Sequence, residues 1–410
     1  MSIEILSPAG DMERFEAALD YGADAIYLGR ETFGMRAGPK NFTYDELKAA
    51  VNAAHAKGRK VYLTCNTLPR NDEIAGFEEY VAQSVDCGID AMIIADIGVM
   101  SLVKKYAPDM EIHMSTQTGI VNYVTARELY SMGAKRVVLA RELSLDEIAE
   151  IRAKTPSDME IEVFVHGAMC VSFSGRCLLS EYLTARDPNR GRCAQPCRWS
   201  YTLMEEKRQG QYFPVFEDDL GTYILNSRDM CMLSHIDDVV KAGACSLKIE
   251  GRAKSAYYVG LTTNAYRMAA DILEKDPEHF SLPKELADEV FKISHRAYCT
   301  GFFYGRPEDG QYYEDSGYIR DFDAAAVVEE CRDGRLWCIQ RNKFAEGAEL
   351  EIISPGEMYK TLTASDLRDE NGEKVESVCH AAMRFSMSCP EGMSFPKNSF
   401  IRIDRNKYPV

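Results

Sequence analysis

The sequence predicts an α/β fold: a (β/α)8 TIM-like barrel with a cysteine-rich insertion, followed by a small C-terminal antiparallel β-barrel domain. Three observations support this prediction. A helical pattern that ends at a glycine and leads into a short β-branched run recurs through the first 275 residues. Eight candidate strands can be counted there. After residue 316 the sequence changes to short runs in which apolar and polar residues alternate. Strands that alternate with helices are typical of a parallel sheet, and eight such units indicate a closed barrel.

The repeated unit is clearest in residues 21–29, 87–95, 132–140 and 242–250, with a fifth variant at 57–65. Its glycine stands where a helix ends in a left-handed conformation, and the apolar run after it is typical of a strand buried on both faces. A doubly wound open sheet is the competing topology, but no Gly-x-Gly-x-x-Gly follows the first strand. We place the strand starts near Ile3, Ala25, Lys60, Ala91, Glu111, Arg136, Glu160 and Ser246.

The intervening segments have helical patterns, and residues 43–57 open with a capping box formed by Thr43 and Glu46. We assign residues 1–275 to the barrel with the cysteine-rich insertion at 167–222, and residues 276–316 to a linker with helical and irregular segments. Residues 317–410 form the small β-barrel domain, since alternating runs at 325–331, 335–341, 348–353 and 400–403 are separated by turn signals.

Composition limits the classes of function. The formal net charge is −16, from 64 acidic and 48 basic residues, which argues against a surface coated in positive charge for nonspecific nucleic-acid binding. This net charge does not exclude a local basic patch. No secretory signal and no run of 18 apolar residues is readable, so we expect a cytoplasmic protein that does not enter a membrane. In that reducing compartment the 13 cysteines are expected to be buried thiols, metal ligands or catalytic groups rather than disulfides.

Active sites of such barrels lie at the carboxyl ends of the strands. Each residue there also has a structural interpretation, as a helix cap or a surface polar group. The segment that begins at His113 and the Lys–Glu–Arg trio at residues 248–252 are the densest strand ends, and the trio suits a carboxylate or phosphate. The candidates are His166, His113, Gln117 and Glu250 for catalysis, and Arg30, Arg141, Lys248 and Arg252 for substrate binding.

The insertion after the seventh strand carries a group of cysteines in polar, arginine-rich sequence. Its spacing is C-x6-C-x15-C-x3-C, with a fifth cysteine 34 positions on, and only one pair has the spacing of a zinc knuckle. A thiolate site with scattered ligands suits an iron–sulfur cluster at least as well, with zinc as the alternative. Reduced thiols gathered by chance remain the structural alternative. The cysteines are Cys170, Cys177, Cys193, Cys197 and Cys231.

The same insertion is locally basic and aromatic. Residues 176–208 hold seven Lys or Arg against four acids, interleaved with aromatic residues, and residues 397–407 form a second basic run. This pattern suits a single-stranded nucleic acid, with Arg198 and Trp199 as substrate-binding candidates, although such a run is also typical of a solvated face. A Cys170–His166 nucleophile is conceivable but lacks a third orienting group.

Residues 162–177 and 186–199 resemble the signature of the collagenase-like peptidase family U32, and residues 7–10, 113–117, 226–229 and 248–252 resemble its other blocks. The resemblance spans the whole chain. It implies an iron–sulfur protein that hydroxylates RNA bases or quinone precursors without molecular oxygen. It also implies a 4Fe-4S cluster on Cys170, Cys177 and Cys193, with Cys231 preferred as fourth ligand and Cys197 as the alternative.

Among members of this family, the chain most resembles those for prephenate-dependent tRNA wobble-uridine hydroxylation. The resemblance therefore implies an enzyme or enzyme component that forms 5-hydroxyuridine, with tRNA and prephenate or another small carboxylate as partners. We expect Lys248, Arg252 and Arg141 to bind the carboxylate. Two alternatives stay open: a collagenase-like peptidase, and a non-catalytic iron–sulfur subunit that acts with a protein partner.

Overall fold

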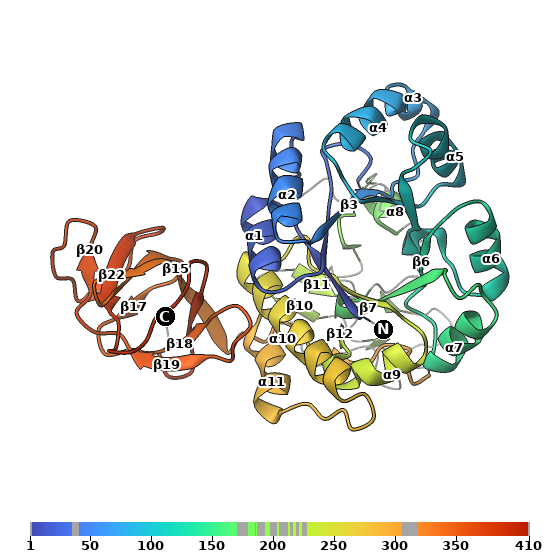
Figure 1. The fold of residues 1–410 in the computed structure, drawn as a ribbon. Coiled ribbons are helices and arrows are strands. Elements are labelled where there is room, and N and C mark those ends of the chain that lie inside the picture. The colour runs from blue at the N-terminus through green and yellow to red at the C-terminus, as the bar shows by residue number, and fades with distance from the viewer. Residues whose placement is uncertain are drawn as a thin grey trace.

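A closed parallel barrel forms the first part of the chain. The computed structural model describes residues 2–34, 41–169, 179–184, 186, 193–196, 203–204, 212–213, 216–218, 221–223, 228–305 and 318–408. Eight strands follow one another around the ring, and β13 pairs with both β7 and β1 to close it (Figure 1). They are β1 (Glu4–Pro8), β2 (Ala25–Leu28), β3 (Lys60–Cys65), β4 (Ala91–Ile94), β5 (Glu111–Met114), β6 (Arg136–Val138), β7 (Glu160–Ala168) and β13 (Ser246–Ile249).

The predicted fold class is confirmed, and the strand starts agree with the prediction to within one residue. The repeated glycine has the conformation that the pattern indicates, with φ of 101° at Gly133 and 105° at Gly243. A Cβ at Gly243 would lie 2.4 Å from Cγ of Arg152, so this turn has no room for a side chain. Each helix therefore stops abruptly and returns the chain to the barrel wall.

Helices cover the outside of the barrel (Figure 1). The Thr43 capping box is present, since the Glu46 N–H donates to Thr43 Oγ1 (3.3 Å) and the Thr43 N–H to Glu46 Oε2 (2.9 Å). No helix in the described ranges is long and apolar enough to cross a membrane. The helices are α1 (Met12–Asp20), α2 (Tyr44–Ala56), α3 (Asn71–Ile74), α4 (Phe77–Asp86), α5 (Ile97–Tyr106), α6 (Tyr123–Ser131), α7 (Leu145–Ala153), α9 (Ile236–Lys241), α10 (Ala256–Lys275) and α11 (Lys284–Glu289), with 3-10 turns η1 (Thr116–Thr118), η4 (Leu233–His235) and η5 (Val290–Lys292).

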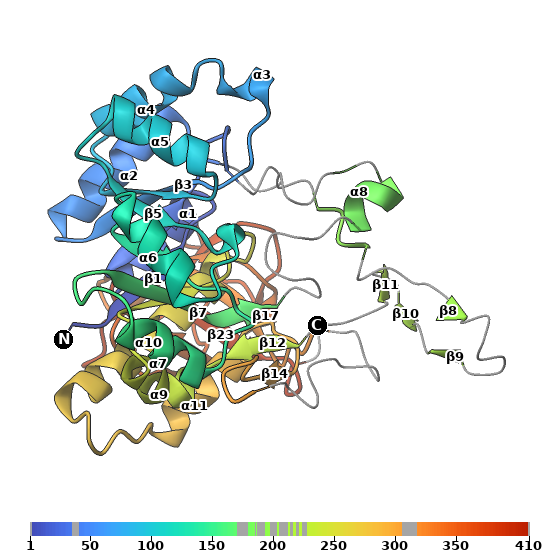
Figure 2. The same cartoon turned by 90° about the vertical axis from the view of Figure 1, so that its right-hand side faces the viewer.

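Two short strands extend the barrel wall in a way the sequence pattern did not predict. β12 (Asp229–Cys231) runs antiparallel to the end of β7, and β14 (Tyr298–Cys299) lies parallel to β12. Figure 2 shows the described elements of the insertion on the side opposite the N-terminus, which is the side of the carboxyl ends of the strands. Its described elements are α8 (Leu179–Thr184), β8 (Leu203–Met204), β9 (Tyr212–Phe213), β10 (Phe216–Asp218) and β11 (Gly221–Tyr223).

The C-terminal part is a half-barrel, an antiparallel sheet of seven strands in the order β19-β18-β23-β15-β16-β22-β20. A turn at Asp333 and Gly334 joins β15 to β16, and both residues have positive φ (52° and 70°), which suits a tight hairpin. A separate pair, β17 (Phe344–Ala345) and β21 (Ser377–Val378), lies beside the sheet. The seven strands are β15 (Phe322–Arg332), β16 (Arg335–Gln340), β18 (Glu349–Ile353), β19 (Lys360–Thr363), β20 (Arg368–Asp369), β22 (Arg384–Ser388) and β23 (Phe400–Asp404).

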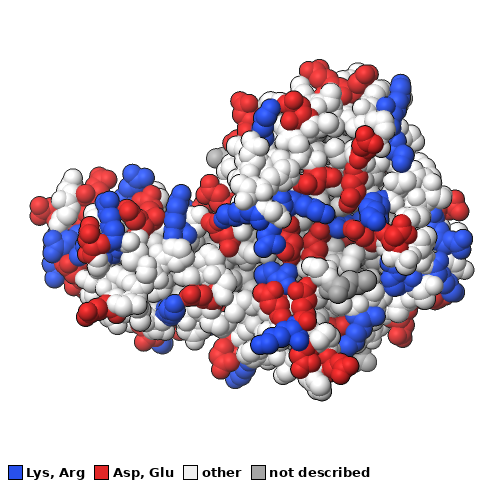
Figure 3. Space-filling view, viewed as in Figure 1, with Lys and Arg blue, Asp and Glu red and all other residues white. Residues whose placement is uncertain are grey.

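Buried contacts join this sheet to α1, α10 and α11. Tyr21 stacks on Phe400 with 5.5 Å between ring centroids, and its hydroxyl donates to the Ile353 carbonyl (2.8 Å). The fully buried Arg402 donates two hydrogen bonds of 2.8 Å to the Glu289 carboxylate. These contacts fix the half-barrel beside the barrel. Figure 3 shows acidic and basic side chains intermixed on the face that carries the N-terminus.

Candidate active site at the barrel mouth

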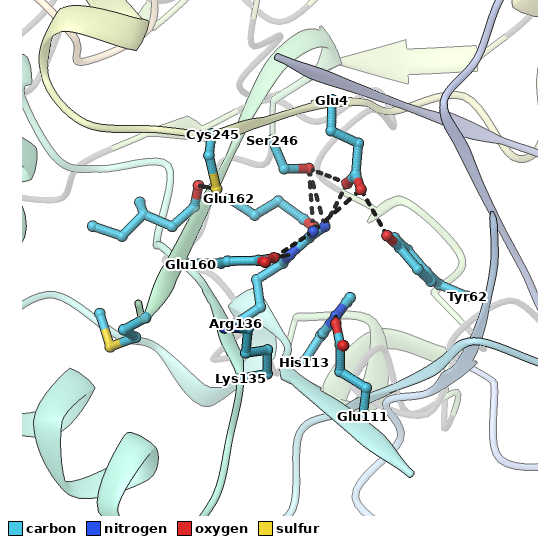
Figure 4. Close-up of polar contacts among 12 residues, drawn as sticks. Glu4, Tyr62, Glu111, His113, Lys135, Arg136, Glu160, Glu162, Cys245 and Ser246 are labelled. Carbon is cyan, nitrogen blue, oxygen red and sulfur yellow. Dashed lines mark hydrogen bonds and ion pairs between the residues drawn. The ribbon is translucent and has the colours of Figure 1, made fainter. Parts of the chain in front are cut away.

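A polar network fills part of the barrel interior where the strands begin (Figure 4). Arg136, the first residue of β6, lies at its centre and is only 3% exposed. Its guanidinium binds Glu162 (3.0 Å) and Glu160 (2.6 Å), and it also pairs with Glu4. Barrel interiors are usually packed with branched apolar residues, so this buried ionic network is a distinctive feature of the barrel. We call the network around Arg136 the ionic floor.

The charges of this floor are set by burial and by Arg136. Burial alone would raise the pKa of Glu4, but the charge and hydrogen bonds of Arg136 lower it to about 2. For Glu162 burial again opposes ionisation, and Lys248 and Arg136 together still lower its pKa. Burial, reinforced by the charge of Arg136, lowers the pKa of His113. The floor therefore holds ionised carboxylates and a neutral imidazole.

The predicted placement of His113 at the mouth is wrong. His113 lies within β5, is fully buried, and faces the Tyr62 ring and the Glu111 carboxylate, which its Nε2 contacts at 2.7 Å. Glu111, His113 and Glu160 bring potential metal-ligand atoms within 4.8 Å of one another. Arg136 already pairs with Glu160, so these groups form part of the ionic floor rather than a cation site.

A column of contacts runs from this floor toward the mouth. Lys248 Nζ binds Glu162 (2.7 Å) and lies 5.3 Å from the centre of the Phe164 ring. The Arg141 guanidinium stacks on Phe164 at 3.8 Å from the ring centroid. Arg141 then approaches the Glu250 carboxylate at 3.6 Å. Successive positively charged and aromatic groups thus support one arginine at the carboxyl end of the barrel.

The trio at residues 248–252 does not converge on one ligand, contrary to the prediction. Lys248 lies within β13 and forms an ion pair with Glu162. Arg252 is 3% exposed and donates to Asn41 (2.7 Å) and Thr64 (3.2 Å), so it ties the loop after β2 to strand β3. Only Glu250 reaches the mouth, because the strand ends at Ile249.

Two further candidates lie apart from Arg141 and Glu250. Arg30 turns toward α4, where it donates to Gln83 (2.8 Å) and stacks on Tyr80, which is not the placement expected of a substrate ligand. Gln117 lies in the turn η1 after β5, held by the Ser115 hydroxyl, which accepts from its backbone N–H (3.2 Å). Its position at a strand end agrees with the prediction.

Arg141 is the best-placed cation of the mouth. Its Nη1 donates to the Ala168 carbonyl (2.6 Å), and the side chain is 14% exposed. Its buried Nε has no hydrogen-bond acceptor among the described residues. Ala168 and Glu250 line a groove that opens at this point. A guanidinium with an unused donor beside an open groove is suited to bind a carboxylate.

His166 is not exposed at the mouth. Its ring lies among Tyr258, Tyr266 and Tyr298, with Nδ1 3.4 Å from the Tyr266 hydroxyl and Nε2 3.5 Å from that of Tyr298. Burial lowers its pKa to about 3. An imidazole with so low a pKa is a weak general base, and this one is enclosed by tyrosines, which weighs against the peptidase alternative.

Two of the candidate metal ligands lie within the described residues. Cys231 is opposite His166 in the β12–β7 ladder, and burial raises the pKa of its thiol to about 11. Cys193 accepts a hydrogen bond from the Gln195 N–H at Sγ (3.3 Å). Neither forms a disulfide with another cysteine of the described residues. Outside the described residues lie Cys170, Cys177, Cys197, Arg198 and Trp199.

Sequence reasoning missed the residues that support Arg141. In the sequence alone, Phe164 and Arg136 resemble ordinary strand residues. The alternation of Glu160, Glu162 and Phe164 with apolar neighbours nevertheless indicates a strand with a polar inner face. The tyrosines around His166 come from α10 and β14, and their meeting depends on tertiary structure. No local pattern indicates it.

Comparison with known proteins adds a family and relatives. The model described as peptidase family U32 matches residues 10–312, and that of the peptidase family U32 C-terminal domain matches residues 320–402. The chain is 38% identical to tRNA hydroxylation protein P of Escherichia coli (strain K12), covering 86% of each chain. It is 36% identical to tRNA hydroxylation protein P1 of Bacillus subtilis (strain 168), covering 92% of this chain and 89% of the relative. A third relative from Escherichia coli, named as a synthase of 5-hydroxycytidine in 23S rRNA, is 34% identical over 81% of this chain and 50% of its own length.

Proposed function

This chain belongs to peptidase family U32, and from that premise we propose that it takes part in hydroxylating a base of RNA. The observation that carries the proposal is the similarity to relatives named for tRNA hydroxylation along at least 86% of the chain, barrel and half-barrel together. The finer proposal is formation of 5-hydroxyuridine at the tRNA wobble position with prephenate as co-substrate. A relative named for 23S rRNA supports RNA as the class of substrate.

In this proposal Arg141 binds the carboxylate of prephenate or of another small acid. The predicted ligands Lys248 and Arg252 are occupied by Glu162 and by Asn41. Arg141 keeps a buried donor, and its ring contact with Phe164 fixes the orientation of the guanidinium. Glu250 lies beside it and orders the same guanidinium until a ligand carboxylate takes its place.

We further propose that Cys170, Cys177, Cys193 and Cys231 hold a 4Fe-4S cluster, with Cys197 as the alternative fourth ligand. The donor chemistry of the described residues fits, since Cys193 accepts an N–H hydrogen bond at sulfur and the β12–β7 ladder brings Cys231 beside the strand from which Cys170 follows. Such a cluster would supply one-electron chemistry. Iron and sulfide analysis after anaerobic purification tests this assignment, and a zinc-loaded, colourless protein would contradict it.

The main test is the RNA of a strain that lacks the gene. We expect mass spectrometry of its tRNA nucleosides to show loss of 5-hydroxyuridine and recovery when the gene is supplied on a plasmid. Unaltered wobble uridines in a strain without a paralogue would refute the function. Restored modification in cells combined with inactive pure protein would indicate that the chain acts as one subunit of a complex.

A substitution at Arg141 tests the carboxylate site. We expect Arg141→Lys to raise the prephenate dissociation constant about tenfold, because a lysine cannot reproduce the two-pronged hydrogen bonding of a guanidinium. Isothermal calorimetry with prephenate measures it. Arg332→Lys is the matched control, since Arg332 also stacks on an aromatic ring, that of Trp337, on the remote β15–β16 hairpin. Equal affinities in both variants would rule out Arg141.

A further inference from the structure

A groove of 770 Å³ separates the barrel mouth from the half-barrel. Residues 253–258 line it on the barrel side, and residues 322–324 with Arg341 line it on the other. Tyr318 and Arg320, which precede β15, complete its wall. The groove therefore lies between two parts of the chain that were predicted separately, and neither part forms it alone.

Most charges along this groove are already neutralised by partners. Lys254 and Arg320 are the exceptions, since neither has a carboxylate within ion-pair distance in the part of the chain that the structure describes. In a chain with a net charge of −16, two unneutralised cations at one place are notable. The neutralised groups are Arg14 with Asp11, Arg341 with Glu13, Asp323 with Arg405, and Glu250 with Arg141.

Both cations are held near one aromatic ring. Lys254 Nζ lies 4.3 Å from the centroid of the Tyr318 ring, and the Arg320 guanidinium lies 5.9 Å from it. Arg320 is further oriented by a hydrogen bond from Nε to the Ser294 hydroxyl (3.2 Å). Lys254 is half-buried and Arg320 is exposed, so both keep contact with solvent and with any ligand in the groove.

The groove is continuous with the candidate active site. Ala168 and Glu250, two groups that contact Arg141, are among its lining residues. Gln195, two residues after Cys193, lines it as well. A polymer lying in the groove would thus contact Lys254 and Arg320 and also lie next to two groups that hold Arg141.

We propose that this groove binds the phosphate backbone of the RNA, with Lys254 and Arg320 contacting phosphates next to the base that enters the mouth. This inference rests on the proposed function, because that function identifies RNA as the polyanion that the groove would bind. Unneutralised cations beside aromatic rings are the usual means of holding a single strand, and each phosphate contact releases a counterion. Arg141, which contacts the lining residues Ala168 and Glu250, remains available for the small carboxylate.

The test is the binding of a fluorescently labelled tRNA transcript to the full chain by anisotropy over a range of salt. We expect Lys254→Gln/Arg320→Gln to weaken binding about tenfold at low salt and to reduce the slope of log K against log salt by about 1.4, since each lost single-strand contact contributes about 0.7. Lys105→Gln/Arg127→Gln is the matched control. It removes the same charges from α5 and α6, which lie on the far side of the barrel from the half-barrel (Figure 1).

The outcomes separate this inference from the proposed function. If both double variants weaken tRNA binding equally, or if neither does, the groove is not the RNA-binding site, even if deletion of the gene abolishes hydroxylation. A loss confined to the groove variant supports it, and if the tRNA of the deletion strain is then unaltered, the hydroxylation proposal fails alone. Prephenate affinity should stay at the wild-type value in the groove variant, since Lys254 and Arg320 do not contact Arg141. Thermal unfolding verifies that each variant is folded.

Discussion

Arg136→Met should lower the free energy of unfolding by about 3–5 kcal/mol, the cost typical of breaking a buried ion pair from one side. The substitution removes the shared partner of three carboxylates, of which Glu162 is fully buried and Glu4 is 16% exposed. Lys248 still compensates Glu162, so Glu4 carries most of the uncompensated charge. Urea unfolding followed by circular dichroism measures the change.

The effect of Arg136→Met should depend on pH in a defined direction. In the native protein the pKa of Glu4 is lowered to about 2 from 4.5, so its contribution to stability is present at neutral pH and is lost as pH falls from about 4.5 to 2. Without Arg136, burial dominates and raises the pKa, so the variant gains stability as pH falls. The difference between the two proteins is therefore largest at pH 7 and shrinks toward pH 4.

Two further variants make this result interpretable. Arg384→Met removes an exposed arginine whose partner Glu329 lies at 3.3 Å, and it should change stability by less than about 1 kcal/mol. Arg136→Met/Glu4→Gln should be more stable than Arg136→Met, because it removes the uncompensated carboxylate. This explanation of the ionic floor would be contradicted if Arg384→Met lost as much stability as Arg136→Met. It would also be contradicted if the double variant were no more stable than Arg136→Met.

The sequence was sufficient to predict the barrel and the positions of some residues at its mouth. Glycine followed by a β-branched run is a local signal, and it located the strand starts to within a residue. The position of a side chain relative to the end of a strand is more sensitive. β5 continues through His113 to Met114 and β13 continues through Lys248 to Ile249, so both residues were expected at the mouth but point into the interior. Arg141 and Glu250 follow their strands, and the expectation for them was correct in placement.

The groove could not be predicted because it depends on how two parts of the chain are oriented. Lys254 follows the last barrel strand and Arg320 precedes the half-barrel, 66 positions later. Their proximity is set by buried contacts such as Tyr21 with Phe400 and Arg402 with Glu289. Composition favoured a basic region within residues 176–208, which lies mostly outside the described residues, whereas the unneutralised cations found here come from other segments.

Cys231→Ala should abolish the iron–sulfur cluster and with it tRNA hydroxylation. The proposal assigns four thiolates to the cluster, and Cys231 is the one that comes from the barrel wall, in the β12–β7 ladder opposite His166. Because the other three proposed ligands lie in the insertion, Cys231 would fix the cluster to the barrel wall. Anaerobically purified native protein should contain about four iron atoms per chain with broad visible absorption, and the variant should lose both.

The control for this variant is Cys299→Ala. Cys299 lies in β14 opposite Met230, one residue from Cys231 along the ladder, and burial likewise raises the pKa of its thiol, so it tests the loss of a neighbouring buried thiol. We expect it to retain iron and hydroxylation, as Cys197→Ala should. Iron retained in Cys231→Ala but lost in Cys197→Ala would reassign the fourth ligand to Cys197. Because iron content is measured independently of activity, a variant that keeps iron but cannot modify tRNA would place Cys231 in another role and leave the cluster itself in place.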